Sequence, residues 1–201
     1  FDLGAFDASH DHRLFAWSAD TTGDEHSRLR IRQVDDDGTH SELDDTIDDV
    51  ANAGVAWSQD GSRLFYVRPD AQERPFQVWR HRVGDPDDRD DVLVFEEPDE
   101  RFFVQIGETR SDRWIVVHTA SQTTSEVHLL ASDDPDGVPV VVVPRIDAVD
   151  YQIDDWGDRL VMLTNAGSSP DEPAEDFRIL QCDPAAEWVD MTNWTELDPH
   201  V

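Results

Sequence analysis

A short apolar run that follows an arginine occurs four times along this chain of 201 residues. The four arginines are Arg13, Arg63, Arg113 and Arg159, and their spacings are 50, 50 and 46 residues (63−13, 113−63, 159−113). Polar residues with Asp or Gly come before each apolar run, and such residues favour tight hairpin turns. Self-similarity at a period of this length is typical of a stacked array of one supersecondary unit.

Each repeat reads as four strands. The expected first strands cover residues 3–8, 54–58, 102–107 and 149–154. The expected second strands are the runs 14–17, 64–67, 114–117 and 160–163. These runs do not alternate with polar residues, so we expect both of their faces to be buried.

The third strands alternate, which indicates that one face is more exposed. Their apolar pairs are Leu29 and Ile31, Phe76 and Val78, Val127 and Leu129, and Phe177 and Ile179. The expected outer strands cover residues 41–47, 92–96, 138–143 and all or part of 189–197. No repeat carries a helical stripe with a period of 3.6 residues, which disfavours a helical solenoid.

This pattern predicts an all-β fold of β-propeller blades, each a four-stranded antiparallel sheet. The blades would cover approximately residues 1–50, 51–100, 101–147 and 148–201 of one partial domain. Closed propellers have about 4–8 blades, so four repeats form either a complete ring or an arc of a larger one. Because residue 1 is Phe rather than Met, we expect an arc.

An arc leaves the flanks of its end blades uncovered. We expect Leu14, Phe15, Val161 and Leu163 on these flanks. Exposed apolar patches promote association. The sequence therefore predicts that the chain self-associates through its end blades.

The chain is strongly acidic: 46 Asp and Glu stand against 16 basic residues, all of them Arg, for a formal net charge of −30. High net charge with low hydrophobicity is typical of disorder, but 7 Trp and 9 Phe within dense apolar runs favour a folded core under an acidic surface. Such a surface repels nucleic acids. The acidity is spread over nearly every turn and outer strand, which favours codon bias or salt adaptation over steering of basic peptides.

No apolar stretch reaches the ~20 residues of a membrane span, and we expect a cytoplasmic protein. The single cysteine, Cys182, excludes a disulfide framework and is expected to fill a strand position. His10-x-His12 is interpreted as a polar turn rather than a metal site. The acidic clusters at 35–38, 85–91 and 133–137 lack the order of an EF-hand and read as hairpin turns.

The chain contains no G-x-S-x-G nucleophile motif. Gly61-Ser62 and Gly167-Ser168 lack the second glycine and a following helix, and both read as turns. We therefore expect no catalytic residue, no metal ligand and no cofactor in this segment.

Several stretches, taken together and in order, resemble the oligopeptidase B group of the prolyl oligopeptidase family of serine peptidases. They are residues 17–25, 77–84, 99–104, 123–127, 157–159, 163–165 and 194–197. The resemblance implies a seven-bladed propeller that covers an α/β-hydrolase domain and admits short peptides, with cleavage after Arg or Lys. The chain departs from the family pattern in a loop at 168–176, which looks like an insertion, and at Asp155-Trp156, where histidines are expected.

The connections between second and third strands vary in length, since the distances from the arginine to the third strand are 16, 13, 14 and 18 residues. Variable loops on a regular scaffold are where binding usually resides, and the resemblance turns this face toward the peptidase domain. The candidate interdomain or gating residues are Thr22, Asp24, Glu25, Arg68, Arg74, Arg101, Thr123, Thr124, Ser125 and Glu126. Plain solvated loops are the competing interpretation.

Two functions stay open at this point. In the first, the segment is the non-catalytic gate of an oligopeptidase B-like enzyme, and its partners are a peptide substrate and an α/β-hydrolase domain of the same chain. In the second, it is a stand-alone scaffold propeller that binds a protein or peptide partner.

Overall fold

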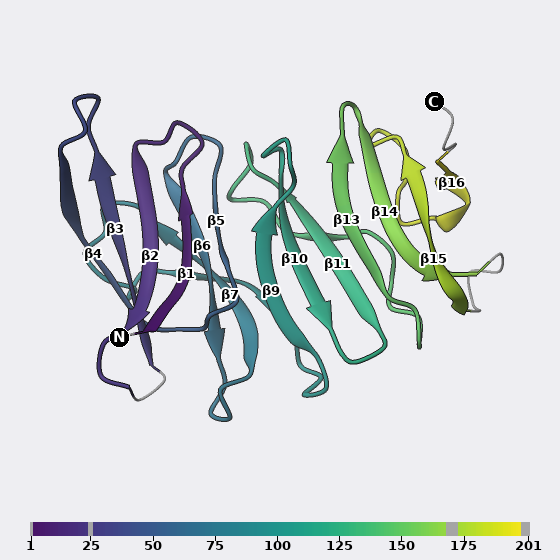
Figure 1. The fold of residues 1–201 in the computed structure, drawn as a ribbon, viewed down its shortest axis with the longest axis horizontal. Coiled ribbons are helices and arrows are strands. Elements are labelled where there is room, and N and C mark those ends of the chain that lie inside the picture. Colours follow the sequence, from purple (N-terminus) through teal and green to yellow (C-terminus); the bar gives the residue numbers. More distant parts are fainter. Residues whose placement is uncertain (1, 24–25, 168–172, 198–201) are drawn as a thin grey trace.

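The computed structural model describes residues 2–23, 26–167 and 173–197. These residues form four four-stranded antiparallel sheets that lie side by side in chain order (Figure 1). We call the sheets blades 1 to 4 and the contact surface between two neighbouring blades a seam. Within each blade the strands are paired in sequence order, which confirms the predicted propeller blades.

Blade 1 consists of β1 (Asp2–Ala8), β2 (Leu14–Asp20), β3 (Ser27–Val34) and β4 (His40–Val50). Blade 2 consists of β5 (Val55–Trp57), β6 (Arg63–Pro69), β7 (Pro75–Arg82) and β8 (Val92–Glu96). Blade 3 consists of β9 (Phe103–Glu108), β10 (Trp114–Ala120), β11 (Ser125–Ala131) and β12 (Val140–Val141). Blade 4 consists of β13 (Tyr151–Trp156), β14 (Arg159–Ala166), β15 (Pro173–Cys182) and β16 (Thr195–Glu196), with a short 3-10 helix at Met191–Asn193.

The outer strand of blade 3 is shorter than the sequence predicts, with two residues in β12. The outer strand of blade 4, β16, is a two-residue part of the predicted range 189–197. β15 is longer than expected, because it begins at Pro173 rather than after residue 176. The predicted insertion at 168–176 is therefore partly strand, and its residues 168–172 lie outside the described residues. Within the described part of the chain, no helix is long and apolar enough to cross a membrane.

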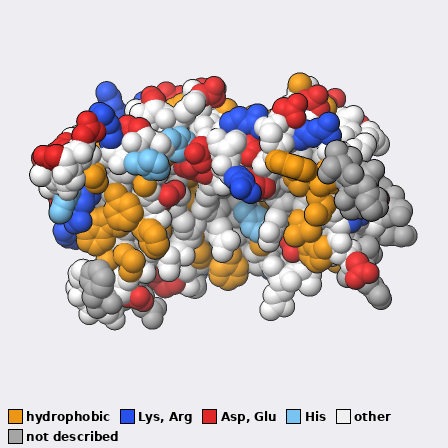
Figure 2. All heavy atoms as spheres, turned by 45° about the horizontal axis from the view of Figure 1, so that its top comes forward, with side chains coloured by type: hydrophobic (Ala, Val, Ile, Leu, Met, Phe, Trp, Pro, Cys, Tyr) orange, Lys and Arg blue, Asp and Glu red, His pale blue; other side chains and the backbone are white. Residues whose placement is uncertain are grey.

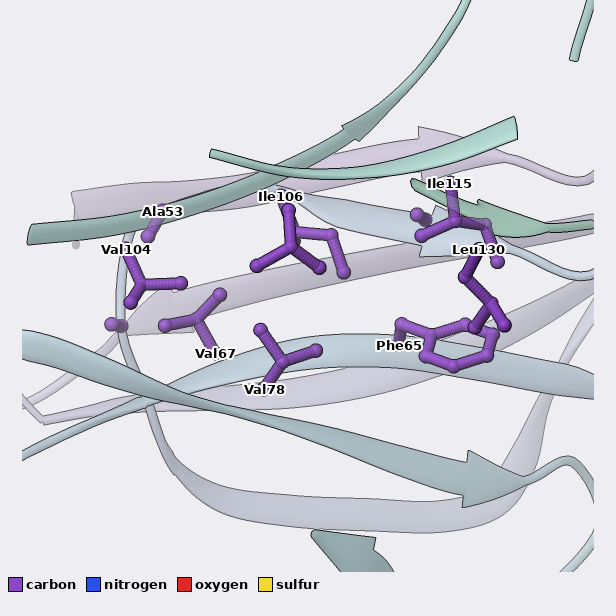
Figure 3. Packing of buried hydrophobic residues seen from close by; sticks show 11 residues of the cluster. Ala53, Phe65, Val67, Val78, Val104, Ile106, Ile115 and Leu130 are labelled. Carbon is purple, nitrogen blue, oxygen red and sulfur yellow. The ribbon is translucent and has the colours of Figure 1, made fainter. Parts of the chain in front are cut away.

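Each seam is filled by apolar side chains from the facing sides of two blades. In the seam of blades 2 and 3, Phe65, Val67 and Val78 lie opposite Val104 and Ile106 (Figure 3). Equivalent clusters fill the seams of blades 1 and 2 and of blades 3 and 4. Sheet-on-sheet packing of this kind removes side chains on both faces of β6, such as Leu64 and Phe65, from water.

The inner strands approach so closely at one point that only glycine fits. Gly54 has φ +91, and a Cβ built there would lie 2.0 Å from the carbonyl oxygen of Ile106. Next to it, the Ile106 N–H donates to the Ala53 carbonyl at 2.9 Å. This backbone contact joins the residues just before β5 of blade 2 to β9 of blade 3.

Arg13 and Arg63 do not occupy equivalent positions in their blades. In three blades, equivalent turn hydrogen bonds accept at Leu14 O, Arg63 O and Trp114 O. Leu14 is therefore the counterpart of Arg63 rather than of Leu64. A shift of one residue along a strand moves a side chain to the opposite face.

This shift corrects one prediction for the end flanks. Leu14 packs into the seam of blades 1 and 2, whereas Phe15 points to the uncovered side and stacks near Phe6, with ring centroids 6.3 Å apart. Phe6 is 58% exposed. Figure 2 shows hydrophobic side chains gathered over β1 and β2 and again over β13 and β14.

The flank of blade 4 is uncovered as well. Trp156, Leu163, Phe177 and Ile179 are all exposed there, while Val161 is half-buried. The prediction that the second strand is buried on both faces is thus wrong for β14, because no described residues cover its outer face. Self-association through these end flanks stays a prediction.

Candidate functional site

The molecule has two edges of different character (Figure 1). The hairpin edge, at the top of the view, carries the short turns within blades. The loop edge, at the bottom, carries the connections β2–β3, β6–β7 and β10–β11 together with the links between blades. The predicted gating residues that the structure describes lie within or next to these connections and links.

Thr22 lies in the β2–β3 connection and is exposed. Its backbone N–H and its hydroxyl both donate to Asp20 Oδ1, at 2.8 and 3.3 Å. Asp24 and Glu25, the next two candidates, lie outside the described residues. The described part of this connection is thus held by a turn around the Asp20 carboxylate.

Arg74 is buried and ties the β6–β7 connection to the link between blades 2 and 3. Its Nη1 donates to the carbonyl oxygens of Glu97 (3.3 Å), Asp99 (3.1 Å) and Phe102 (2.9 Å). Its Nε donates to Asp70 Oδ2 at 2.9 Å. These contacts direct the donors of Arg74 inward, where they hold the link in place.

Arg68 contacts aromatic rings of its own blade. Its guanidinium carbon lies 5.5 Å from the ring centroid of Tyr66 and 4.9 Å from that of Trp79. It also pairs with Asp88. A cation over an aromatic face stabilises by about 0.5–2 kcal/mol. Arg68 therefore helps to hold β6 and β7 together through Tyr66 and Trp79.

Thr124 and Ser125 join blade 3 to the link that leads into blade 4. The Thr124 hydroxyl accepts from the Ala148 N–H at 2.9 Å. The Ser125 hydroxyl donates to the Tyr151 carbonyl (3.0 Å) and accepts from the Tyr151 N–H (2.7 Å). Both side chains are buried, so they fix the position of this link.

Arg145, in the same link, is a residue that the sequence analysis did not single out. Its Nη2 donates to the buried Glu97 Oε2 (2.5 Å) and to Thr119 Oγ1 (3.0 Å). Its guanidinium carbon lies 3.5 Å from the ring centroid of Phe102, and its backbone N–H donates to Glu126 Oε2 at 2.8 Å. The only sequence signal for it was a charged residue at the end of a run of valines.

These contacts shape a pocket of about 710 Å³ at the loop edge of blade 3. Its walls are the start of β9, the β10–β11 connection and the link between blades 3 and 4. The candidates Arg101, Thr123 and Thr124 line it together with Phe103 and Asp147. The volume falls within the range of about 300–1,000 Å³ that is usual for ligand pockets.

Of two charged residues that line the pocket, Arg101 forms an ion pair and Asp147 does not form one with any described residue. Arg101 donates to both oxygens of Asp99, through Nε at 3.0 Å and Nη2 at 2.7 Å. These hydrogen bonds to Arg101 lower the pKa of Asp99 to about 2. Asp147 is exposed and makes no hydrogen bond or ion pair with any described residue.

The hairpin edge holds a group that could bind a metal ion. His10 Nε2 lies 2.9 Å from Glu108 Oε2, and Asp112 completes a set whose ligand atoms lie within 4.8 Å of one another. Glu108 also accepts from the Trp57 N–H, so blades 1, 2 and 3 meet at this carboxylate. Burial raises the pKa of Glu108. The structure thus joins His10 to blade 3 rather than to His12.

A fully buried histidine crosses the seam of blades 1 and 2. His81 Nε2 lies 3.1 Å from Asp45 Oδ1, and Nδ1 lies 2.8 Å from Asp91 Oδ1. Burial alone lowers the pKa of His81, but the hydrogen bonds and charges of Asp45 and Asp91 outweigh it and raise the pKa to about 9. Tyr66 donates to the second oxygen of Asp91 at 2.8 Å. His81 is therefore an imidazolium held between two carboxylates at neutral pH.

Comparison with known proteins identifies relatives of the whole segment. Residues 1–200 match the family described as prolyl oligopeptidase, N-terminal beta-propeller domain. Protease 2 of Moraxella lacunata is 34% identical over 173 residues, which is 86% of this chain and 24% of that protein. Dipeptidyl aminopeptidase BI of Pseudoxanthomonas mexicana is 35% identical over 181 residues, 90% of this chain and 24% of that protein.

Among solved structures, oligopeptidase B from Leishmania major superimposes with a TM-score of 0.69 at 22% identity. The match covers 99% of this chain and 34% of that one. At this identity the likeness concerns the fold alone. The chain spans about a quarter of the length of the curated relatives it matches.

Proposed function

Because this chain belongs to the prolyl oligopeptidase family, as part of its N-terminal β-propeller domain, we propose that it gates the entry of short peptides to a serine active site in a separate α/β-hydrolase domain. The segment itself is assigned no catalytic residue, since it lacks a G-x-S-x-G motif. The parent enzyme would cleave after Arg or Lys, as the resemblance to oligopeptidase B implies.

The observation that carries this proposal is the pocket at the loop edge of blade 3. Three of the predicted gating residues, Arg101, Thr123 and Thr124, line it. Buried contacts of Arg74 and Arg145 hold its walls, so it is supported by the scaffold rather than by free loops. A supported pocket among variable connections is the expected place for a gate to contact a peptide.

The uncovered end flanks fit the same proposal. Phe6 and Trp156, at opposite ends, are 58% and 63% exposed. Further blades of the parent propeller would cover them and complete a ring, which we propose to be seven-bladed. The alternative, a stand-alone scaffold, predicts a parent reading frame without a hydrolase domain.

The gate can be tested by narrowing the pocket in the full-length parent enzyme. We expect Thr123→Trp to lower kcat/KM for a short Arg-containing peptide by about tenfold, because the indole occupies the pocket mouth. Thr39→Trp, in the exposed β3–β4 turn, is the matched control and should leave the rate unchanged. The fluorescence of an internally quenched peptide measures both.

Two results would overturn the proposal. One is a parent frame that lacks both a G-x-S-x-G motif and a later histidine. The other is equal rates for Thr123→Trp and Thr39→Trp.

A further inference from the structure

Three blades meet at one carboxylate on the hairpin edge. Glu108 ends β9 of blade 3, and only 9% of its side chain is exposed. Its Oε1 accepts the N–H of Trp57 in blade 2, and its Oε2 lies 2.9 Å from Nε2 of His10 in blade 1. Because His10 and Glu108 are 98 residues apart in the sequence, the packing of the blades alone brings them together.

A second carboxylate completes a set of metal-ligand atoms. Asp112 lies in the β9–β10 turn, and the ligand atoms of His10, Glu108 and Asp112 all lie within 4.8 Å of one another. A tetrahedral ion with bonds of about 2.1 Å holds its ligand atoms about 3.4 Å apart. The pair of His10 and Glu108 is slightly closer than this, so small side-chain rotations bring the set to the required spacing.

The carboxylates at this point have no arginine partner. The charges that act most on Asp7, which is half-buried on β1, are those of His10 and Asp112. Those that act most on Glu108 are His10 and Asp7. Asp7 and Asp112 form no ion pair with any described residue. Three carboxylates against one imidazole leave a charge of minus two even when His10 is protonated, and such a site attracts cations.

The composition and support of the set distinguish it from an acidic surface patch. It includes an imidazole nitrogen, and the Trp57 N–H orients the Glu108 carboxylate, as second hydrogen bonds orient the ligands of metal sites. Asp112 is exposed, whereas His10 and Glu108 are largely buried, so an ion can enter from the solvent side. One nitrogen with carboxylates suits Zn²⁺, whereas Ca²⁺ prefers about six to eight oxygens.

We propose that His10, Glu108 and Asp112 bind a divalent ion of the zinc class, which ties the hairpin edge of blade 1 to that of blade 3. Three protein ligands leave the fourth position of a tetrahedral ion to water. His12, exposed in the same turn as His10, is not part of the set. The inference departs from the sequence-based expectation of no metal ligand, and it does not depend on the gating proposal.

The test is a calorimetric titration of the full-length parent enzyme with zinc chloride after metal has been removed by a chelator. We expect His10→Asn and Glu108→Gln each to weaken one binding event at least about tenfold, since loss of even an outer partner of a metal site costs about 10–100-fold. Glu108→Gln keeps an acceptor for the Trp57 N–H. His12→Asn makes the same change two residues from His10 and should leave the titration as in the unaltered enzyme.

Thermal unfolding of the same proteins gives a readout that does not depend on activity. An ion that binds only the folded arrangement stabilises it by mass action. Zinc at about 100 times the dissociation constant should therefore raise the midpoint of the unaltered enzyme and of His12→Asn. At the same concentration, the stabilisation of His10→Asn and Glu108→Gln should fall by about half or more, because binding is at least tenfold weaker.

Three results would overturn the inference. The first is the absence of saturable Zn²⁺ binding, and the second is equal affinity in His10→Asn and His12→Asn; the contact of His10 with Glu108 would then be an ion pair alone. The third is Ca²⁺ binding as tight as that of Zn²⁺, because the nitrogen ligand would then contribute nothing. If the variants of the buried ligands fail to fold, Asp112→Asn decides, since Asn accepts the left-handed φ of 59° at this exposed position.

Discussion

β6 of blade 2 and β14 of blade 4 carry the same apolar pattern in different surroundings. In β6, Leu64 and Phe65 point to opposite faces, and both are fully buried because a blade lies on each side. In β14, Leu160 and Met162 are buried against blade 3, whereas Leu163 on the other face is 41% exposed. An uninterrupted apolar run therefore encodes a strand with two apolar faces. Each face is buried only where a neighbouring blade packs against it.

The largest expected effect contrasts the two faces directly. In the 201-residue chain, Phe65→Ala should lower the free energy of unfolding by about 3–5 kcal/mol, because it leaves a cavity in a closed seam. Leu163→Ala should cost less than about 1 kcal/mol, because its side chain is already partly in water. Chemical denaturation followed by tryptophan fluorescence measures both.

The parent protein sharpens this comparison. If a further blade covers β14 there, the cost of Leu163→Ala should rise to about 2 kcal/mol or more, while that of Phe65→Ala stays the same. An unchanged, small cost for Leu163→Ala in the parent would contradict the proposed continuation of the propeller.

The next expected effect is a pH dependence of stability that comes from the seam of blades 1 and 2. The seam of blades 1 and 2 contains the buried His81 between Asp45 and Asp91. Since the pKa of His81 is raised to about 9 in the folded chain from an unfolded value near 6.5, its stabilisation is complete below about pH 6.5. It is lost as the pH rises through 9, by about 3 kcal/mol in total.

Denaturation midpoints between pH 6 and 10 test this loss. His81→Gln should flatten the curve in that window. His26→Gln changes an exposed histidine beside Asp49 and should leave the curve as in the unaltered chain. Parallel curves for His81→Gln and the unaltered chain would show that the imidazolium contributes nothing to the seam.

A smaller effect compares two arginines of the loop edge. Arg74 is buried with its donors directed at three carbonyls. Arg101 is exposed, and its one ion pair among the described residues is with Asp99. Arg74→Ala should cost about 2 kcal/mol, because it leaves buried acceptors without a donor. Arg101→Ala should cost less than about 0.5 kcal/mol. Thermal unfolding monitored by circular dichroism measures the difference, and equal costs would mean that Arg74 does not hold the link between blades.

The blade pattern could be predicted because it depends on local chemistry. Turn residues before each apolar run place a hairpin there, and the run itself prefers a buried strand. The exchange between Leu14 and Phe15 could not be predicted in this way. Aligning the repeats on Arg13 and Arg63 misplaces the strand by one residue, and only the turn hydrogen bonds to Leu14 and Arg63 set the register.

The residues of the candidate site also divide into those that the sequence predicted and those that it missed. Loop variability indicated the connection that contains Thr123 and Thr124, and the structure places both at a pocket. Arg145 was missed, since its importance comes from Glu97 and Phe102, which lie more than 40 residues away in the sequence. No spacing rule connects residues that meet only when two links between blades come together.

The sequence by itself determined that this chain builds four antiparallel blades, because apolar periodicity and turn chemistry act within a few residues. The tertiary structure alone decided which face of each end blade is covered and which carboxylate pairs with which arginine. Those outcomes depend on how neighbouring blades pack and how their links cross. The same packing pairs Arg101 with Asp99 and Arg145 with Glu97, and it leaves Asp147 without an ion pair among the described residues.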